Sequence, residues 1–210
     1  DKLEQQVKIL AECERKTRIV CYSNVDVVAD NTRTPWNTFV YDNRSDLSDY
    51  LIVHNQAIQT SSIIMDASFA KEVRFQDCLK CHQDWDLVLR AKAADAFFAG
   101  TSAVLVDYFI SADPVNRISR DTAVVHTVEW SEMARHLLSN RARATLYVSR
   151  IFPRLPAARS PRMWLSLFWA ARPGGAGTIT VARAVIRKLL PPRLVARLEK
   201  VWRRTRFTAS

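Results

Sequence analysis

Residues 19–28 have the sequence IVCYSNVDVV, and this stretch decides the fold class. Its β-branched and aromatic residues predict a β-strand. Upstream, apolar residues recur at helical spacing among Lys, Glu and Gln over residues 1–15, which predicts an amphipathic helix. Helical and strand patterns continue to alternate as far as residue 110, and this alternation is typical of an α/β fold.

Six further elements are expected between the turn at 30–32 and residue 110. They are a short strand at 36–41, a helix at 45–55, a strand at 58–65 interrupted by a polar trio, a short helix at 69–75, a helix at 84–94 and a strand at 97–110 with a break at 100–102. A long helix is then predicted over 129–152, ended by Pro153, Pro156 and Pro161. We therefore expect an α/β region at 1–125, a helix with a Pro-rich boundary at 126–160 and a helical extension at 161–210.

The composition is that of a chain that folds around a core. Hydrophobic residues make up 48% of the 210 residues, and only 4 are Gly, which excludes a disordered chain and a glycine-repeat protein. No apolar run approaches the ~20 residues of a membrane-spanning helix. No signal peptide opens the chain, so we expect a cytoplasmic protein with reduced thiols.

Positive charge is concentrated at the C-terminal end. Residues 141–210 hold 16 of the 31 Lys and Arg residues and one acidic residue, Glu199, which gives this segment a net charge of +15. Basic amphipathic helices are predicted at 178–190 and 192–206, and the apolar stripe of the first is formed by Ile179, Ala182, Ile186 and Leu189. Such helices suit the anionic inner face of a membrane, so we expect peripheral contact through 178–206. The alternatives are a solvated basic face and nucleic-acid binding, for which the sequence has no recognised motif.

The cysteines raise a separate possibility. Cys78-Leu79-Lys80-Cys81-His82 has the spacing of a c-type haem attachment site. Haem attachment requires export, for which no signal is visible, and a zinc site would need a second pair of ligands at a useful spacing. Two incidental cysteines beside a helix start are therefore favoured.

The densest group of polar residues lies at the start of the helix predicted at 84–94. It has the sequence His82-Gln83-Asp84-Trp85-Asp86. A carboxylate at a helix N-terminus is stabilised by the free amides and the helix dipole. Asp84 is therefore either the N-cap of this helix or an ionised base at the mouth of a cleft.

Three segments of the chain occur in an order that resembles a known family. They are Asp1-Lys2-Leu3-Glu4-x-Gln6-Val7 with the strand that follows it, Asn55 to Ile64 with the trio Thr60-Ser61-Ser62, and Gln83-Asp84-Trp85-Asp86-Leu87-x-Leu89-Arg90. Together they resemble the C-terminal portion of a family 2 glycosyltransferase with the GT-A fold, a Rossmann-like mixed sheet with helices. The resemblance covers residues 1–125.

The resemblance implies roles for individual residues. Asp84 would be the general base, which takes the proton from the acceptor hydroxyl. The implied substrate-binding residues are Thr60, Ser61, Ser62, Gln83, Trp85, Asp86, Arg117 and Arg120. Of these, Asp86 is expected, with Arg90, to hold the helix start, and the two later arginines could meet the leaving diphosphate.

The resemblance also implies what this sequence lacks. The family binds Mg²⁺ or Mn²⁺ through an Asp-x-Asp motif, which is expected upstream of Asp1. The chain is thus expected to be a truncated piece that is inactive alone. The complete protein would transfer a sugar from a nucleotide-sugar donor, with inversion, to a glycan or lipid-linked acceptor in polysaccharide or glycolipid biosynthesis. The alternative is a non-catalytic binding module whose basic tail docks on an anionic membrane or nucleic acid.

Overall fold

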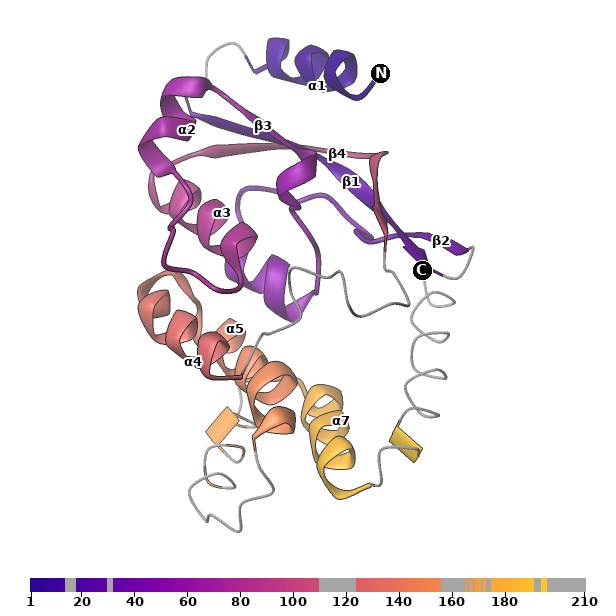
Figure 1. Ribbon diagram of the computed structural model, residues 1–210, viewed down its shortest axis with the longest axis vertical. Helices are drawn as coiled ribbons and strands as arrows, with labels where there is room; N and C mark the ends of the chain where they lie inside the picture. The colour runs from indigo at the N-terminus through magenta and orange to yellow at the C-terminus, as the bar shows by residue number, and fades with distance from the viewer. Residues whose placement is uncertain are drawn as a thin grey trace. The chain divides into compact units, whose positions relative to one another are not determined.

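The structure is a computed structural model of the 210-residue chain (Figure 1). It describes residues 1–13, 18–29, 32–109, 124–155 and 175–190, together with residues 165, 167, 169, 170, 172, 194 and 195. The chain divides into two compact units, residues 1–139 and 140–210. This division falls inside the segment 126–160.

The first unit is built on a mixed four-stranded sheet. Its longest pairing joins β1 (Ile19–Ala29) to β4 (Phe97–Phe109), which run parallel. β2 (Thr32–Pro35) and β3 (Ile63–Met65) pair antiparallel with β1, near its end and its beginning respectively. Because β4 occupies one edge of β1 throughout, the two short strands share the other edge. The predicted α/β class and the strand at 19–28 are confirmed.

Helices cover both faces of this sheet. α1 (Lys2–Ala11) and α3 (Gln83–Ala93) lie on opposite sides of it (Figure 1). Residues 20–25 of β1 are all buried, as expected for a strand covered on both faces. The other helical elements of the unit are η1 (Asp49–Val53), η2 (Thr60–Ser62), α2 (Ala67–Val73), α4 (Val124–Met133) and η5 (Arg135–Leu137).

Tyrosines dominate the core on the sheet face away from α1. The Tyr22 hydroxyl accepts a hydrogen bond of 2.9 Å from the backbone N–H of Tyr41 and lies 3.5 Å from the Tyr50 hydroxyl. Tyr50 in turn donates to the carbonyl oxygen of Phe39 at 3.1 Å. Burial raises the pKa of Tyr22 and of Tyr50, and raises that of Tyr41 to about 12. These phenols therefore stay neutral and hydrogen-bonded at physiological pH.

Gly100 lies against this tyrosine cluster and leaves no room for a side chain. A Cβ at this position would lie 2.5 Å from Tyr22 Cζ and 2.6 Å from Val40 Cγ1. Because the Tyr22 ring is fully buried and hydrogen-bonded, we expect Gly100→Ala to lower the free energy of unfolding by about 1–3 kcal/mol. Denaturant unfolding followed by circular dichroism measures this loss.

Gly177→Ala is the matched control, because a Cβ there would have no atom within 4 Å. A Gly100→Ala variant as stable as this control would show that the tyrosine cluster is not packed as described.

The predicted strand at 36–41 is wrong. The short strand lies earlier, at Thr32–Pro35, and a loop follows it. The Asn37 side chain explains the loop, since its Nδ2 donates to the Ala57 carbonyl at 2.8 Å and its Oδ1 accepts from the Ala57 N–H at 2.6 Å. These bonds tie the loop to the segment before η2 and replace a strand ladder.

The predicted break at 100–102 is a bulge within a continuous strand. Ser23 pairs with Thr101 and Asn24 with Val104, so β4 carries extra residues at this point. The polar, Gly-containing sequence that suggested a break therefore marks a β-bulge.

The single long helix predicted over 129–152 is also wrong. The chain forms α4, η5, an extended residue at Leu138 and then α5 (Asn140–Leu146), which continues as a π-helical turn, η6 (Tyr147–Ile151). Ser139 explains the interruption. Its N–H donates to the Ser48 hydroxyl at 2.9 Å and its own hydroxyl donates to Asp49, so it is fixed by the first unit's η1 region.

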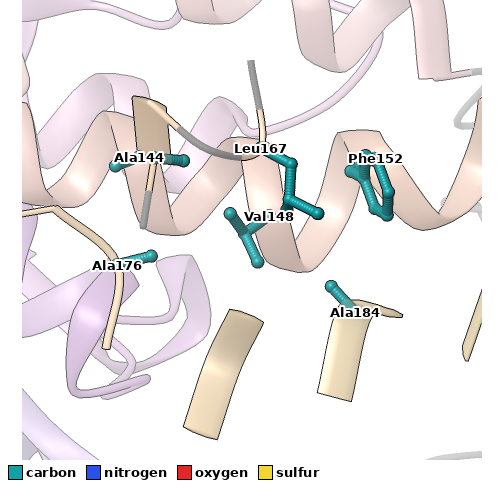
Figure 2. Packing of buried hydrophobic residues seen from close by; sticks show 7 residues of the cluster. Ala144, Val148, Phe152, Leu167, Ala176 and Ala184 are labelled. Atoms are coloured by element: carbon teal, nitrogen blue, oxygen red, sulfur yellow. The ribbon is translucent and has the colours of Figure 1, made fainter. Parts of the chain in front are cut away.

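The second unit is helical around its own small core. The buried residues of this core are Ala144, Val148, Phe152, Leu167, Ala170, Ala176 and Ala184 (Figure 2). α7 (Thr178–Leu189) contributes Ala184, with Val181 and Val185 packed beside it, and confirms the helix predicted at 178–190. Most of the helix predicted at 192–206 lies outside the described residues. No described helix is both long and apolar enough to cross a bilayer.

Candidate functional site

The polar trio and the start of α3 meet at one hydrogen bond. The Thr60 hydroxyl donates to Oδ1 of Asp84, although 24 residues separate the two. Thr60 is exposed and Asp84 is half-buried, so the pair lies at the surface of the first unit. Among the residues that the structure describes, Thr60 is the hydrogen-bond partner of this carboxylate.

The N-terminal helix holds the trio in place. Lys2 Nζ donates to the carbonyl oxygen of Ser61 at 2.7 Å, and Gln6 Nε2 donates to that of Ser62 at 2.7 Å. Gln6 is fully buried, whereas its helix neighbours are mostly exposed, so this contact fixes how α1 docks. The three segments that carry the family resemblance are therefore adjacent in space. Lys2 and Gln6 were quoted in the first segment, but the sequence assigned them no role at the site.

The three residues of the trio have different environments. Ser62 is buried, and its hydroxyl donates to the carbonyl oxygen of Gln59 at 2.8 Å. The Thr60 and Ser61 side chains are exposed. The two exposed residues are thus the members of the trio that could contact a ligand.

Asp84 is not the N-cap of α3, so the capping interpretation is wrong. The helix begins at Gln83, and its N-cap is His82, whose φ of 62° is left-handed. Asp84 lies in the first turn, where the helix dipole stabilises a negative charge. Its carboxylate therefore projects from the helix start toward Thr60.

Three aromatic rings stack beside Asp84. The His82 and Trp85 rings are 4.7 Å apart and nearly parallel, at 8°, and Trp130 of α4 lies 4.8 Å from His82. His82 Nε2 is 3.1 Å from the Thr127 hydroxyl, also on α4. The strained backbone at His82 is therefore held by contacts from a helix about 45 residues later in the chain.

Asp86 faces the interior and stabilises the start of α3. It is 3% exposed, and it accepts hydrogen bonds from Arg90 Nε at 2.7 Å and from Trp130 Nε1 at 3.4 Å. Arg90 also donates to the carbonyl oxygens of Val73 and Arg74, which end α2. The pair therefore ties together three helices behind the site.

Four predicted site residues remain, and the structure describes two of them, Gln83 and Trp85. Gln83 is half-buried, and its Nε2 donates to the carbonyl oxygen of Leu79 at 3.0 Å. Trp85 is half-buried in the ring stack. Arg117 and Arg120 lie outside the described residues.

The cysteines do not form the arrangement that a haem or a metal would need. All four are free; Cys78 is exposed, but Cys81 is buried and the His82 ring packs against the rings of Trp85 and Trp130. Burial raises the pKa of the Cys21 thiol to about 11, which keeps it protonated. The described part of the chain contains no group of three or more His, Cys, Asp or Glu side chains that could hold a metal ion. The Mg²⁺ or Mn²⁺ ligands that the resemblance implies are expected upstream of Asp1.

Comparison with known proteins yields one informative similarity. The amylovoran biosynthesis glycosyltransferase AmsB of Erwinia amylovora is 28% identical over 148 residues, which are 67% of this chain and 48% of AmsB. The chain thus spans about half the length of the relative it matches. No protein-family model matches the sequence. No solved structure matches it either. The chain is therefore similar to a glycosyltransferase.

Proposed function

We propose that this chain is part of a family 2-like, GT-A glycosyltransferase that moves a sugar from a nucleotide sugar to an acceptor hydroxyl with inversion. The observation that carries the proposal is the contact between Thr60 and Asp84. It joins two of the three resembling segments, and the third, α1, holds the trio through Lys2 and Gln6. The similarity to AmsB supports the same class of reaction.

In this proposal Asp84 is the general base. The acceptor oxygen forms a bond to the anomeric carbon of the donor sugar while the bond from that carbon to the diphosphate oxygen breaks. The proton of the acceptor hydroxyl passes to Asp84, and the nucleoside diphosphate leaves with the bonding electron pair. Thr60 bonds one carboxylate oxygen and so turns the other toward the acceptor.

Other residues would bind the substrates. Trp85 would pack beside the sugar or the acceptor, and Ser61 would contact the same region. Arg117 and Arg120 would meet the diphosphate as it gains negative charge. In the complete protein Mg²⁺ or Mn²⁺, held by residues upstream of Asp1, would neutralise the diphosphate. The acceptor would be a glycan or a lipid-linked precursor.

The Thr60–Asp84 contact provides the test of this function. In the full-length protein that carries this sequence, we expect wild type to transfer a radiolabelled sugar from one member of a nucleotide-sugar panel. Thr60→Val removes a hydrogen bond to a charged group, worth about 1.5–3 kcal/mol, and should lower kcat about tenfold or more. Thr60→Ser keeps the hydroxyl and should keep most of the activity.

The serine variant is also the control for packing, because it loses the methyl group that valine retains. Equal activity of Thr60→Val and wild type would contradict the positioning role of Thr60. No transfer by wild type with any donor, under conditions where the protein is folded, would favour the non-catalytic binding module.

A further inference from the structure

We propose that the second unit docks on an anionic membrane surface, through the exposed apolar stripe of α7 and the arginines beside it. This inference concerns a different part of the chain from the candidate site. It does not depend on the proposed transfer reaction.

α7 has two apolar faces, and the core of the unit uses only one of them. Val181, Ala184 and Val185 face the buried cluster around Phe152 (Figure 2). The stripe of Ile179, Ala182, Ile186 and Leu189 lies on another face of the helix. A surface helix that served only to cover a core would carry polar residues there.

The second face is exposed to a degree that is unusual for aliphatic side chains. Ile179 is 69% exposed and Leu189 is 67% exposed. They lie near the two ends of the stripe on the 12-residue helix, and between them Ala182 is exposed and Ile186 is half-buried. Leu165 and Trp169 of the same unit are also exposed, at 68% and 40%. Exposed apolar surface of this kind marks an interaction site.

The positive charge of the second unit indicates that its partner is negatively charged. Residues 141–210 carry a net charge of +15, and Arg183 and Arg187 of α7 flank the apolar stripe at helical spacing. Burial and, after it, the nearby charges of Arg154 and Arg187 lower the pKa of Arg150, so this side chain lies near two other cations. Each Lys or Arg near anionic lipid strengthens binding.

Two other partners fit these observations less well. A nucleic acid offers phosphates but no apolar medium for Ile179 and Leu189, which are aliphatic and do not stack on bases as aromatic rings do. A second copy of the chain would bring another unit of the same positive charge against the first. A lipid bilayer supplies both the anionic surface and the apolar layer that the stripe requires.

Co-sedimentation of the full chain with vesicles tests the proposal. We expect binding to vesicles of phosphatidylcholine with about 30 mol% phosphatidylglycerol and little binding to phosphatidylcholine alone, because anionic lipid attracts polybasic segments. Binding should weaken as NaCl rises, because salt screens the charges. The double variant Ile179→Ser, Leu189→Ser should bind the anionic vesicles about tenfold more weakly or worse.

The matched control is Leu3→Ser, Val7→Ser, which removes two side chains of α1 that are each 57% exposed. It should bind vesicles as wild type does. A second variant, Arg183→Gln with Arg187→Gln, should bind more weakly at low salt and show a shallower dependence on NaCl. This charge variant keeps the proposal testable if the serine variant fails to fold.

Several results would overturn the proposal. These are equal binding to neutral and anionic vesicles, no vesicle binding at low salt, and an α7 double variant that binds like wild type. Tighter binding to a single-stranded oligonucleotide than to anionic vesicles would instead identify a nucleic-acid surface. A dimer in lipid-free solution that the serine variant dissociates would identify a second copy as the occupant.

Discussion

Replacing Asp84 with Asn is expected to reduce sugar transfer by about 100- to 10,000-fold in the full-length protein, because general-base catalysis contributes a factor of this size. Asparagine has nearly the same shape, and its amide oxygen can still accept the hydrogen bond from Thr60. It cannot take a proton from the acceptor hydroxyl at neutral pH. The fall should therefore appear in kcat, with donor binding and thermal stability close to those of wild type.

Asp95→Asn is the matched control for the same change of charge. Asp95 follows α3 at its other end, is exposed and has a left-handed φ of 61°, a conformation that asparagine tolerates well. This variant should transfer sugar at the wild-type rate. Turnover by Asp84→Asn at more than a tenth of the wild-type rate would show that another group is the base.

Replacing Trp130 with Ala is expected to lower the free energy of unfolding of the first unit by about 3–5 kcal/mol. The Trp130 ring is 1% exposed, packs 4.8 Å from His82 and donates to Asp86. Its loss would leave a cavity at the start of α3 and free the Asp86 carboxylate from one partner. Denaturant unfolding followed by circular dichroism at the helical signal measures the change.

Trp85→Ala provides the comparison within the same ring stack. Trp85 stacks on His82 but is only half-buried, so its removal should cost clearly less stability than that of Trp130. Equal losses for the two variants would mean that α4 does not pack behind α3 as described. Trp130→Phe should fall between them in effect, because it keeps most of the ring and loses the Nε1–H.

Much of the first unit could be predicted because its signals are local. The strand at 19–28 and the helices at 1–15 and 84–94 follow from residue patterns that span one element each. The errors occurred where a distant residue decides the local conformation. The loop after residue 35 depends on Asn37 and Ala57, and the interruption before α5 depends on Ser139 bonding to the η1 region, some 90 residues earlier.

In the candidate site, too, the local features could be predicted from the sequence and the contacts between distant residues could not. The resemblance indicated Asp84 and the trio separately, and the residue pattern could not tell a base from an N-cap. Their contact is a property of tertiary structure, as are the bonds from Lys2 and Gln6, which reach 59 and 56 residues along the chain. The buried environment of Asp86 depends in addition on α4, which has no signal in the sequence around residue 86.

The parallel pairing of β1 with β4 has a consequence for how the protein is synthesised. Ile19 pairs with Phe97, so 78 further residues must leave the ribosome before β1 acquires its neighbour on that edge. At ribosomal rates of about 5–20 residues per second, this interval lasts about 4–16 s. During that time the backbone N–H and C=O groups on this edge of β1 lack their β4 partners and can pair with other nascent chains. The polypeptide should therefore require a chaperone early in translation, well before the surfaces proposed for catalysis and for membrane binding have formed.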